Sequence, residues 1–146
     1  MRAEIRHEVE LIQPLADLER QSQLAVLACI DSGAELCRFD QPATPPTHRL
    51  SYSAVVDNDH ILHVDHNTAE RWLPTGGHVD AGEHPRNTAL REAKEELSIE
   101  GEFLKAGPIF VSITETIGKT AGHTDVSLWY VLRGKRTEQL DFDHSE

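Results

Sequence analysis

Residues 76–99 read GGHVDAGEHPRNTALREAKEELSI, and this stretch decides the fold. Pro85 suits the first position of a helix, because its ring fixes φ near the helical value and no N–H is needed there. Apolar residues then recur at helical spacing, which predicts a helix over 85–97. Three carboxylates fall within an arc of about 100° beside the apolar face of this helix. They belong to Glu92, Glu95 and Glu96.

The acidic arc of this predicted helix has a physical cost. Like charges three or four residues apart destabilise an isolated helix by about 0.2–0.5 kcal/mol per pair. Solvent screening offsets such repulsion, and a solvated acidic face is the interpretation that the helix alone favours. A bound cation also offsets it, since carboxylate oxygens are the ligands that Mg²⁺ and Mn²⁺ prefer.

The residues before the helix decide between these interpretations. Glu83 follows Gly77 after five residues, and Arg91 follows Glu83 after seven. This spacing resembles the Nudix box, G-x5-E-x7-R-E-U-x-E-E-x-G-U, in which U is a bulky apolar residue. The small Ala93 stands at a U position, and Ser98 stands where the box has glycine. The box is matched at Gly77, Glu83, Arg91, Glu92, Glu95, Glu96 and Ile99.

The resemblance implies an α+β fold in which a Nudix-like mixed β-sheet is sandwiched between helices. We expect the Nudix domain to span 48–146. An N-terminal helical extension is expected to span 1–40 and to pack on that domain. Apolar spacing in the extension predicts two helices separated near Pro14, the second of which reaches about Leu36.

Beyond the extension, the apolar period changes from helical to two. Alternation from Leu50 to Val56, followed by turn residues at 57–59, predicts a β-hairpin. The chain ends at 143–146, where a Ser-capped helix would begin, whereas the family usually continues into a closing helix. We therefore expect either a shortened chain or N-terminal helices that cover the corresponding sheet face. Further strands are expected at 103–104, 109–114 and 126–132.

The resemblance also assigns roles to the box residues. It implies that Glu92, Glu95 and Glu96 ligate Mg²⁺ or Mn²⁺, the expected cofactor. The carbonyl of Gly77 is implied as a further ligand. One of Glu92 or Glu95 is alternatively the group that deprotonates the attacking water, so both are catalytic candidates.

Positioning groups and a base outside the box complete the candidate catalytic set. Arg91 and Glu83 resemble the orienting pair of the box, in which the arginine holds a carboxylate in place. In many members of the family the base lies on a later loop. Glu115 and Asp125 flank such a loop at 118–122, and the sequence leaves the choice between them open.

Three residues are candidates for substrate binding: Trp72, His78 and His66. Trp72 comes shortly before the glycine pair, and we expect it to pack in the core. An aromatic side chain at the rim of a glycine turn can instead stack on a base.

Two other groups of polar residues are interpreted as having no part in metal or phosphate binding. His60, His63 and His66 do not predict a metal site, because on a strand and its exit their side chains diverge. Lys119 and His123 could contact phosphate, but a solvated loop is the preferred interpretation.

Composition limits the partners. The chain has 146 residues with 14 Lys and Arg against 25 Asp and Glu, a formal net charge of −11. This balance argues against binding a nucleic-acid polymer or a membrane surface, and a homodimer is left open. The start of the chain leads into charge rather than an apolar segment, so a cytoplasmic location is expected. Cys29 and Cys37 lack zinc-site spacing and are expected to be packing thiols.

The favoured function is a metal-dependent hydrolase that cleaves a diphosphate linkage in a nucleoside diphosphate joined to another group. Its partner is then a small-molecule diphosphate substrate. One alternative is a non-catalytic nucleotide-binding sensor with the Nudix fold, which the complete set of carboxylates disfavours. The other is a Nudix-fold isomerase of allylic diphosphates. That reaction needs a proton donor facing the carbon chain, and the two cysteines lie in the extension instead.

Overall fold

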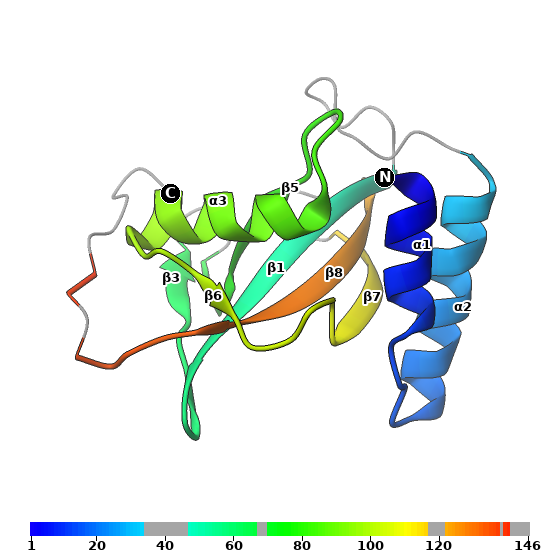
Figure 1. Ribbon diagram of the computed structural model, residues 1–146. Helices are drawn as coiled ribbons and strands as arrows, with labels where there is room; N and C mark the ends of the chain where they lie inside the picture. Colours follow the sequence, from blue (N-terminus) through cyan, green and yellow to red (C-terminus); the bar gives the residue numbers. More distant parts are fainter. Residues whose placement is uncertain (34–46, 67–69, 117–121, 138, 141–146) are drawn as a thin grey trace.

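The computed structural model describes residues 1–33, 47–66, 70–116, 122–137 and 139–140 (Figure 1). None of the described helices is both long and apolar enough to cross a bilayer. The helices are α1 (Arg2–Glu10), α2 (Asp17–Asp31) and α3 (Pro85–Leu97). The strands are β1 (Thr47–Asp57), β2 (His60–Ile61), β3 (Val64–His66), β4 (Arg71–Leu73), β5 (Thr75–His78), β6 (Glu102–Phe103), β7 (Phe110–Glu115) and β8 (Thr124–Arg133).

The main sheet is built around one long parallel pair. β1 pairs with β8 in parallel from Thr47 opposite Thr124 to Val56 opposite Arg133. β5 and β2 pair antiparallel with β1, and β7 and β6 pair antiparallel with β8. The β1–β2 connection turns at Asn58, whose φ is 54°. The predicted mixed sheet and the predicted hairpin are therefore confirmed.

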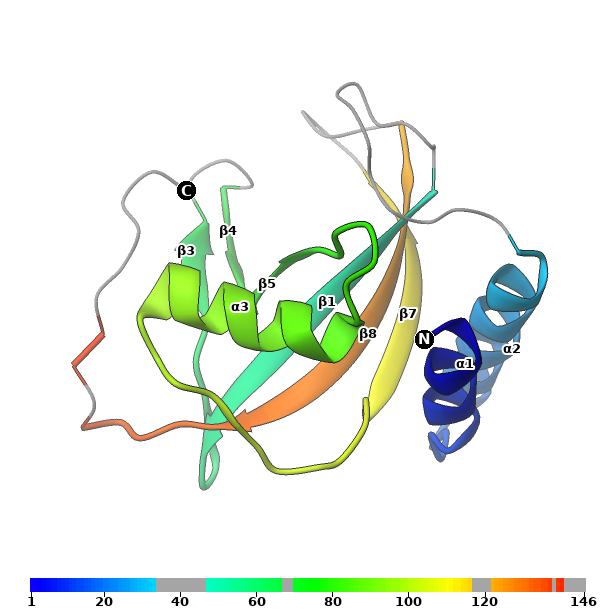
Figure 2. The same cartoon turned by 45° about the horizontal axis from the view of Figure 1, so that its top comes forward.

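The helix α3 lies along one face of this sheet (Figure 2). The hydroxyl of Ser51 donates to the carbonyl of Pro85 at 2.7 Å, and the hydroxyl of Ser53 donates to the carbonyl of Ala89 at 3.3 Å. Strand residues two apart share a face, so α3 covers the face of the sheet on which Ser51 and Ser53 lie. Farther along, α3 buries apolar side chains against the sheet in a cluster of Val55, Ala93, Leu97, Ile99 and Leu132.

The helices α1 and α2 pack on the same face, beside α3. Their apolar residues join those of β7, β8 and Ala89 of α3 in one buried cluster. Nε2 of His84, the residue that caps the start of α3, lies 3.8 Å from Oε2 of Glu8 in α1. The N-terminal helical extension thus shares a core with the sheet. The cluster comprises Ile5, Val9, Ile12, Val26, Ile30, Ala89, Val111, Val126, Leu128 and Tyr130.

Two expectations about these helices are corrected. The second helix ends at Asp31 and not near Leu36, because Gly33 takes a φ of 75°, which does not continue a helix. Residues 34–36 lie outside the described ranges. The N-terminal helices also do not cover the sheet face opposite α3, since their contacts are made on the α3 side.

The opposite face carries an aromatic group. The rings of Tyr52 and Trp129 stack with centroids 4.8 Å apart, and Phe110 packs against Trp129 at 6.2 Å. The indole N–H of Trp129 donates to the hydroxyl of Ser112 at 3.0 Å. Within the described part of the chain, the buried contacts of the three helices are made on the other face. The predicted α+β fold, a mixed sheet with packed helices and an N-terminal helical extension, is confirmed.

Candidate functional site

The site begins where β5 leads into α3. A turn closes with the backbone N–H of Glu83 donating to the carbonyl of Asp80 at 3.0 Å. The next residue, His84, caps the helix: its Nδ1 accepts from the backbone N–H of Arg86 at 3.2 Å. Pro85 then occupies the first helical position. The helix ends at Leu97, so the predicted bounds of 85–97 are confirmed.

Arg91 holds the carboxylates of this segment together. Its Nε and Nη2 donate to the two oxygens of Glu83 at 3.2 and 3.1 Å, a two-bond geometry that fixes both groups. Its Nη1 donates to Glu92 at 2.7 Å and to Glu95 at 3.1 Å. Its Nη2 also donates to the carbonyl of His78 at 3.2 Å. One guanidinium therefore connects β5, the turn and α3, and offsets part of the repulsion in the acidic arc.

Glu83 is held as a carboxylate. Burial by itself raises the pKa of this group, but hydrogen bonds from Arg91 and Thr88 lower it by more, and the net pKa lies below the usual value. The hydroxyl of Thr88 donates to Glu83 at 2.7 Å. Because the charged form is favoured, Glu83 and Arg91 form a persistent ion pair at neutral pH.

The two glycines of β5, Gly76 and Gly77, are required because neighbouring atoms come too close to leave room for a Cβ. A Cβ on Gly77 would lie 2.3 Å from a carboxylate oxygen of Glu92. A Cβ on Gly76 would lie 2.4 Å from the carbonyl oxygen of Ser51 and 2.5 Å from the ring of Tyr52. The Glu92 carboxylate, with a side chain only 13% exposed, is therefore seated directly against the β5 backbone.

The remaining carboxylates of the arc differ in exposure. The side chain of Glu95 is 59% exposed, and Glu96 is half-buried. Burial raises the pKa of Tyr52 to about 12, and the nearby negative charges of Asp125, Glu96 and Glu92 add to this shift. Tyr52 therefore lies in the electrostatic field of both the box carboxylates and Asp125.

The two candidates for a distal base point to different sides of the sheet. Glu115 is exposed and shares a strand face with Val111, on the side of α1 and α2. Asp125 alternates with the buried Val126 and so lies on the side of Tyr52. Burial raises the pKa of Asp125, and the nearby His123 opposes this shift. Between the two, only Asp125 shares a face with Tyr52.

Asp125 belongs to a cluster that the sequence did not predict as a unit. The cluster also contains His48 of β1, His78 of β5 and His123, which precedes β8. His78 and Asp125 were candidates separately, His123 was interpreted as a solvated loop residue, and His48 was missed. The alternation of β1 puts His48 on the same face as Tyr52, but only the β1–β8 register brings it to Asp125.

Trp72 and His66 lie apart from the main sheet. β3 and β4 form a two-stranded ribbon, with His66 opposite Arg71 and Asp65 opposite Trp72. The side chain of Trp72 is 68% exposed, so the expected core packing is wrong. Its strand belongs to this small ribbon and not to the six-stranded sheet, which is the sheet that the helices cover. Its role in substrate binding stays a prediction, as does that of His66.

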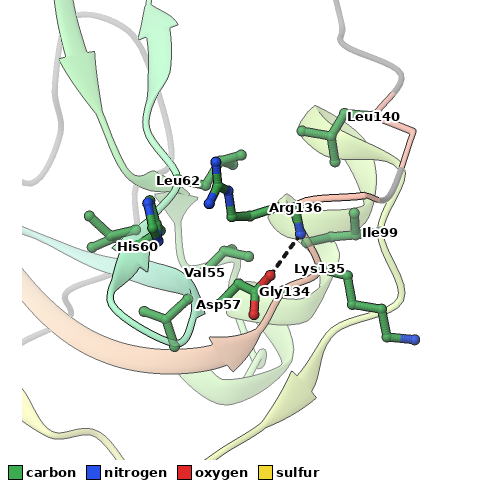
Figure 3. A pocket seen from close by; sticks show the side chains of 11 residues that line it. Val55, Asp57, His60, Leu62, Ile99, Gly134, Lys135, Arg136 and Leu140 are labelled. Atoms are coloured by element: carbon green, nitrogen blue, oxygen red, sulfur yellow. Dashed lines mark hydrogen bonds between the residues drawn. The ribbon is translucent and has the colours of Figure 1, made fainter.

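A cavity of about 270 Å³ lies at the other end of the sheet, where β1 and β8 end (Figure 3). Its lining includes Val55, Leu62, Leu140, Lys135 and Arg136, and the Arg136 side chain extends toward Leu62. The backbone N–H of Arg136 donates to Asp57 at 3.0 Å. None of the carboxylates of the acidic arc lines this cavity, so it is separate from the candidate site.

Comparisons with known proteins identify the family. Residues 47–146 match the model of the NUDIX domain, and the chain belongs to this family. The fold is similar to that of a NUDIX-family hydrolase from Clostridium perfringens, with a TM-score of 0.54 and 21% identity over 68% of this chain and 75% of that one. It is also similar to E. coli dihydroneopterin triphosphate pyrophosphohydrolase, with a TM-score of 0.57 and 16% identity over 75% of this chain and 77% of that one. No curated protein matches the sequence.

Proposed function

We propose that this protein is a metal-dependent hydrolase that cleaves a diphosphate linkage in a nucleoside diphosphate joined to another group. Family membership supports a hydrolase of this type. The observation that carries the proposal is the seating of Glu92 against Gly77, with Arg91 bonded to Glu83, Glu92 and Glu95. An ordinary solvated acidic face needs neither a glycine under one carboxylate nor an arginine that gathers three.

The residues fit Mg²⁺ or Mn²⁺. Glu92, Glu95 and Glu96 offer hard oxygen ligands within two turns of one helix, and the Gly77 carbonyl belongs to the strand on which Glu92 rests. When bound, the cation neutralises diphosphate oxygens and makes phosphorus more electrophilic. A cation also compensates the net charge of −11, which otherwise repels an anionic substrate.

The side chains of the site differ in what they are able to do. Glu92 is nearly buried and bonded to Arg91, so it is suited to a fixed ligand position. Glu95 is exposed and accepts a hydrogen bond from Nη1 of Arg91 at 3.1 Å, so it is suited to accept the proton of the attacking water. Arg91 and Glu83 act as a positioning pair, since their mutual bonds hold the guanidinium against the carbonyl of His78.

The test is a screen of nucleotide sugars, dinucleotide cofactors, nucleoside triphosphates and diphosphoinositols for Mg²⁺-dependent phosphate release. We expect one class to be hydrolysed and Glu96→Gln to lower turnover at least about 100-fold. Glu100→Gln is the matched control, because Glu100 is a nearby exposed carboxylate that pairs with Lys94 outside the arc. Parental turnover in Glu96→Gln contradicts the proposal. Tight nucleotide binding without hydrolysis supports the sensor alternative instead.

A further inference from the structure

A second group of metal-ligating side chains lies on the sheet face opposite α3. His48 stands near the start of β1, and His78 ends β5. His123 immediately precedes β8, and Asp125 lies at the start of that strand. Each offers one ligand atom, and these four atoms all lie within 4.8 Å of one another. We propose that these residues form a binding site for a transition-metal cation of the Zn²⁺ type, separate from the acidic arc of α3.

The geometry of this histidine cluster is close to that of a four-ligand site. A tetrahedral Zn²⁺ with bonds of about 2.0–2.2 Å separates its ligand atoms by about 3.3–3.6 Å. The Nε2 of His123 already lies 3.3 Å from a carboxylate oxygen of Asp125. The ring of His48 lies 4.7 Å from that of His123 and 5.3 Å from that of His78, measured between centroids. The four ligand atoms, all within 4.8 Å of one another, therefore need to approach by no more than about 1.5 Å to reach coordination distance.

Thr116 orients one of the rings. Its backbone N–H and its hydroxyl both donate to the carbonyl of His123, at 2.9 and 3.0 Å. The same hydroxyl oxygen lies 3.2 Å from Nδ1 of His123. With the hydroxyl proton directed to the carbonyl, Nδ1 is the donor of this contact and Nε2 keeps the lone pair that a metal requires. Metal-bound histidines are commonly fixed in this way through the other ring nitrogen.

The donor set selects the class of metal. Three imidazoles and one carboxylate favour Zn²⁺, Co²⁺, Ni²⁺ or Cu²⁺, whereas Mg²⁺ prefers sites made of oxygen ligands alone. His48 is fully buried, and the side chains of His123 and Asp125 are each 15% exposed. A cation is therefore largely shielded from water, as is usual for a site that remains occupied.

His78 connects the two sites. Its ring belongs to the histidine cluster, while its carbonyl accepts a hydrogen bond from Arg91 at 3.2 Å. A cation on the ring fixes β5 at the residue that supports the Arg91 guanidinium. We therefore assign the histidine cluster a structural and positioning role next to the acidic arc. Its occupancy is measurable without any hydrolysis assay.

The experiment uses the full chain, stripped of metal with a chelator and titrated with Co²⁺. We expect one Co²⁺ per chain with the intense visible absorption of four-coordinate cobalt, displaced by Zn²⁺ and not by excess Mg²⁺. Glu96→Gln should keep this spectrum, which separates the histidine cluster from the acidic arc. Absence of the four-coordinate band in the parent protein, or its loss in Glu96→Gln, overturns the proposal.

Variants locate the ligands. His123→Gln and Asp125→Asn should each weaken Zn²⁺ binding by at least about 100-fold, and Thr116→Val by about 10–100-fold. His60→Gln is the matched control, because this histidine is 52% exposed and lies outside the cluster. Thermal unfolding without metal checks that each variant folds. If His123→Gln does not fold, Asp125→Asn decides the result. Parental Zn²⁺ affinity in a folded Asp125→Asn variant contradicts the assignment.

Discussion

Replacing Ser98 by glycine should stabilise this protein, which is the opposite of the usual effect of a new glycine. Ser98 is the residue after α3 and has φ 56° and ψ 29°, a left-handed conformation. Its side chain is exposed, while the next residue, Ile99, is 3% exposed and packs in the core. The sequence predicted this conformation, because Ser98 stands where the Nudix box has glycine.

The magnitude follows from two opposing effects. A non-glycine residue in the left-handed region costs about 1–2 kcal/mol, which glycine removes. Glycine also loosens the unfolded chain, which costs about 0.4–1 kcal/mol. The net gain is about 0.5–1 kcal/mol. For a chain of this length each kcal/mol changes Tm by about 2–4 °C, so we expect a rise of about 1–4 °C.

The assay is thermal unfolding by calorimetry, with turnover measured beside it. Ser32→Gly is the matched control, since Ser32 also follows a helix but has φ −63°, and its hydroxyl donates to the carbonyl of Cys29 at 2.7 Å. Ser32→Gly should lower Tm, and Ser98→Gly should raise it with unchanged turnover. If both variants lower Tm, the left-handed conformation of Ser98 carries no strain and the reasoning is refuted.

Three further changes test the acidic segment and the N-terminal helices. Millimolar Mg²⁺ or Mn²⁺ should raise Tm of the parent protein, because a cation at a hundredfold excess over Kd adds about 2.7 kcal/mol to the free energy of unfolding. Without metal, Glu96→Gln should melt at or above the temperature of the parent, and metal should raise its Tm by less than it raises that of the parent. The pKa of Glu83 is lower in the folded protein than in the unfolded chain, so its ionised form contributes stability that is present at neutral pH and lost as pH falls through the folded pKa. Glu83→Gln should therefore lower stability at pH 7 by about 1–3 kcal/mol, with a smaller difference from the parent in acid, measured by denaturant titration. Deleting residues 1–40 should give an insoluble or molten product, because α1 and α2 bury part of the core, and a soluble remnant with cooperative unfolding contradicts this.

Local signals were sufficient for the elements nearest the chemistry. The bounds of α3 follow from Pro85 at its start and Ser98 at its end, two residues whose backbone preferences act without tertiary contacts. The β1–β2 hairpin follows from alternation and a turn at Asn58. The pairing of Arg91 with Glu83 depends on the seven residues that separate them along the chain. This spacing belongs to the motif, so the motif alone predicted the pair.

Long-range arrangement escaped prediction. The sequence does not state which face α1 and α2 cover, because an apolar helical face fits any apolar sheet face of similar size. Trp72 is apolar and was placed in the core, but its strand joined a small ribbon outside the sheet. The histidine cluster depends on the register between β1 and β8, and periodicity within either strand carries no information about a partner so far along the chain.

The parallel pairing of β1 with β8 also has a kinetic consequence. Every residue pair in this ladder joins positions 77 apart along the chain, so the ladder forms only after a long loop has closed. β5, which carries Gly77 and His78, is held in the sheet by β1. The histidine cluster, which joins β1 and β5 to residues at the start of β8, therefore reaches its place late in folding. An isolated fragment that contains the whole Nudix box but lacks β8 cannot assemble it.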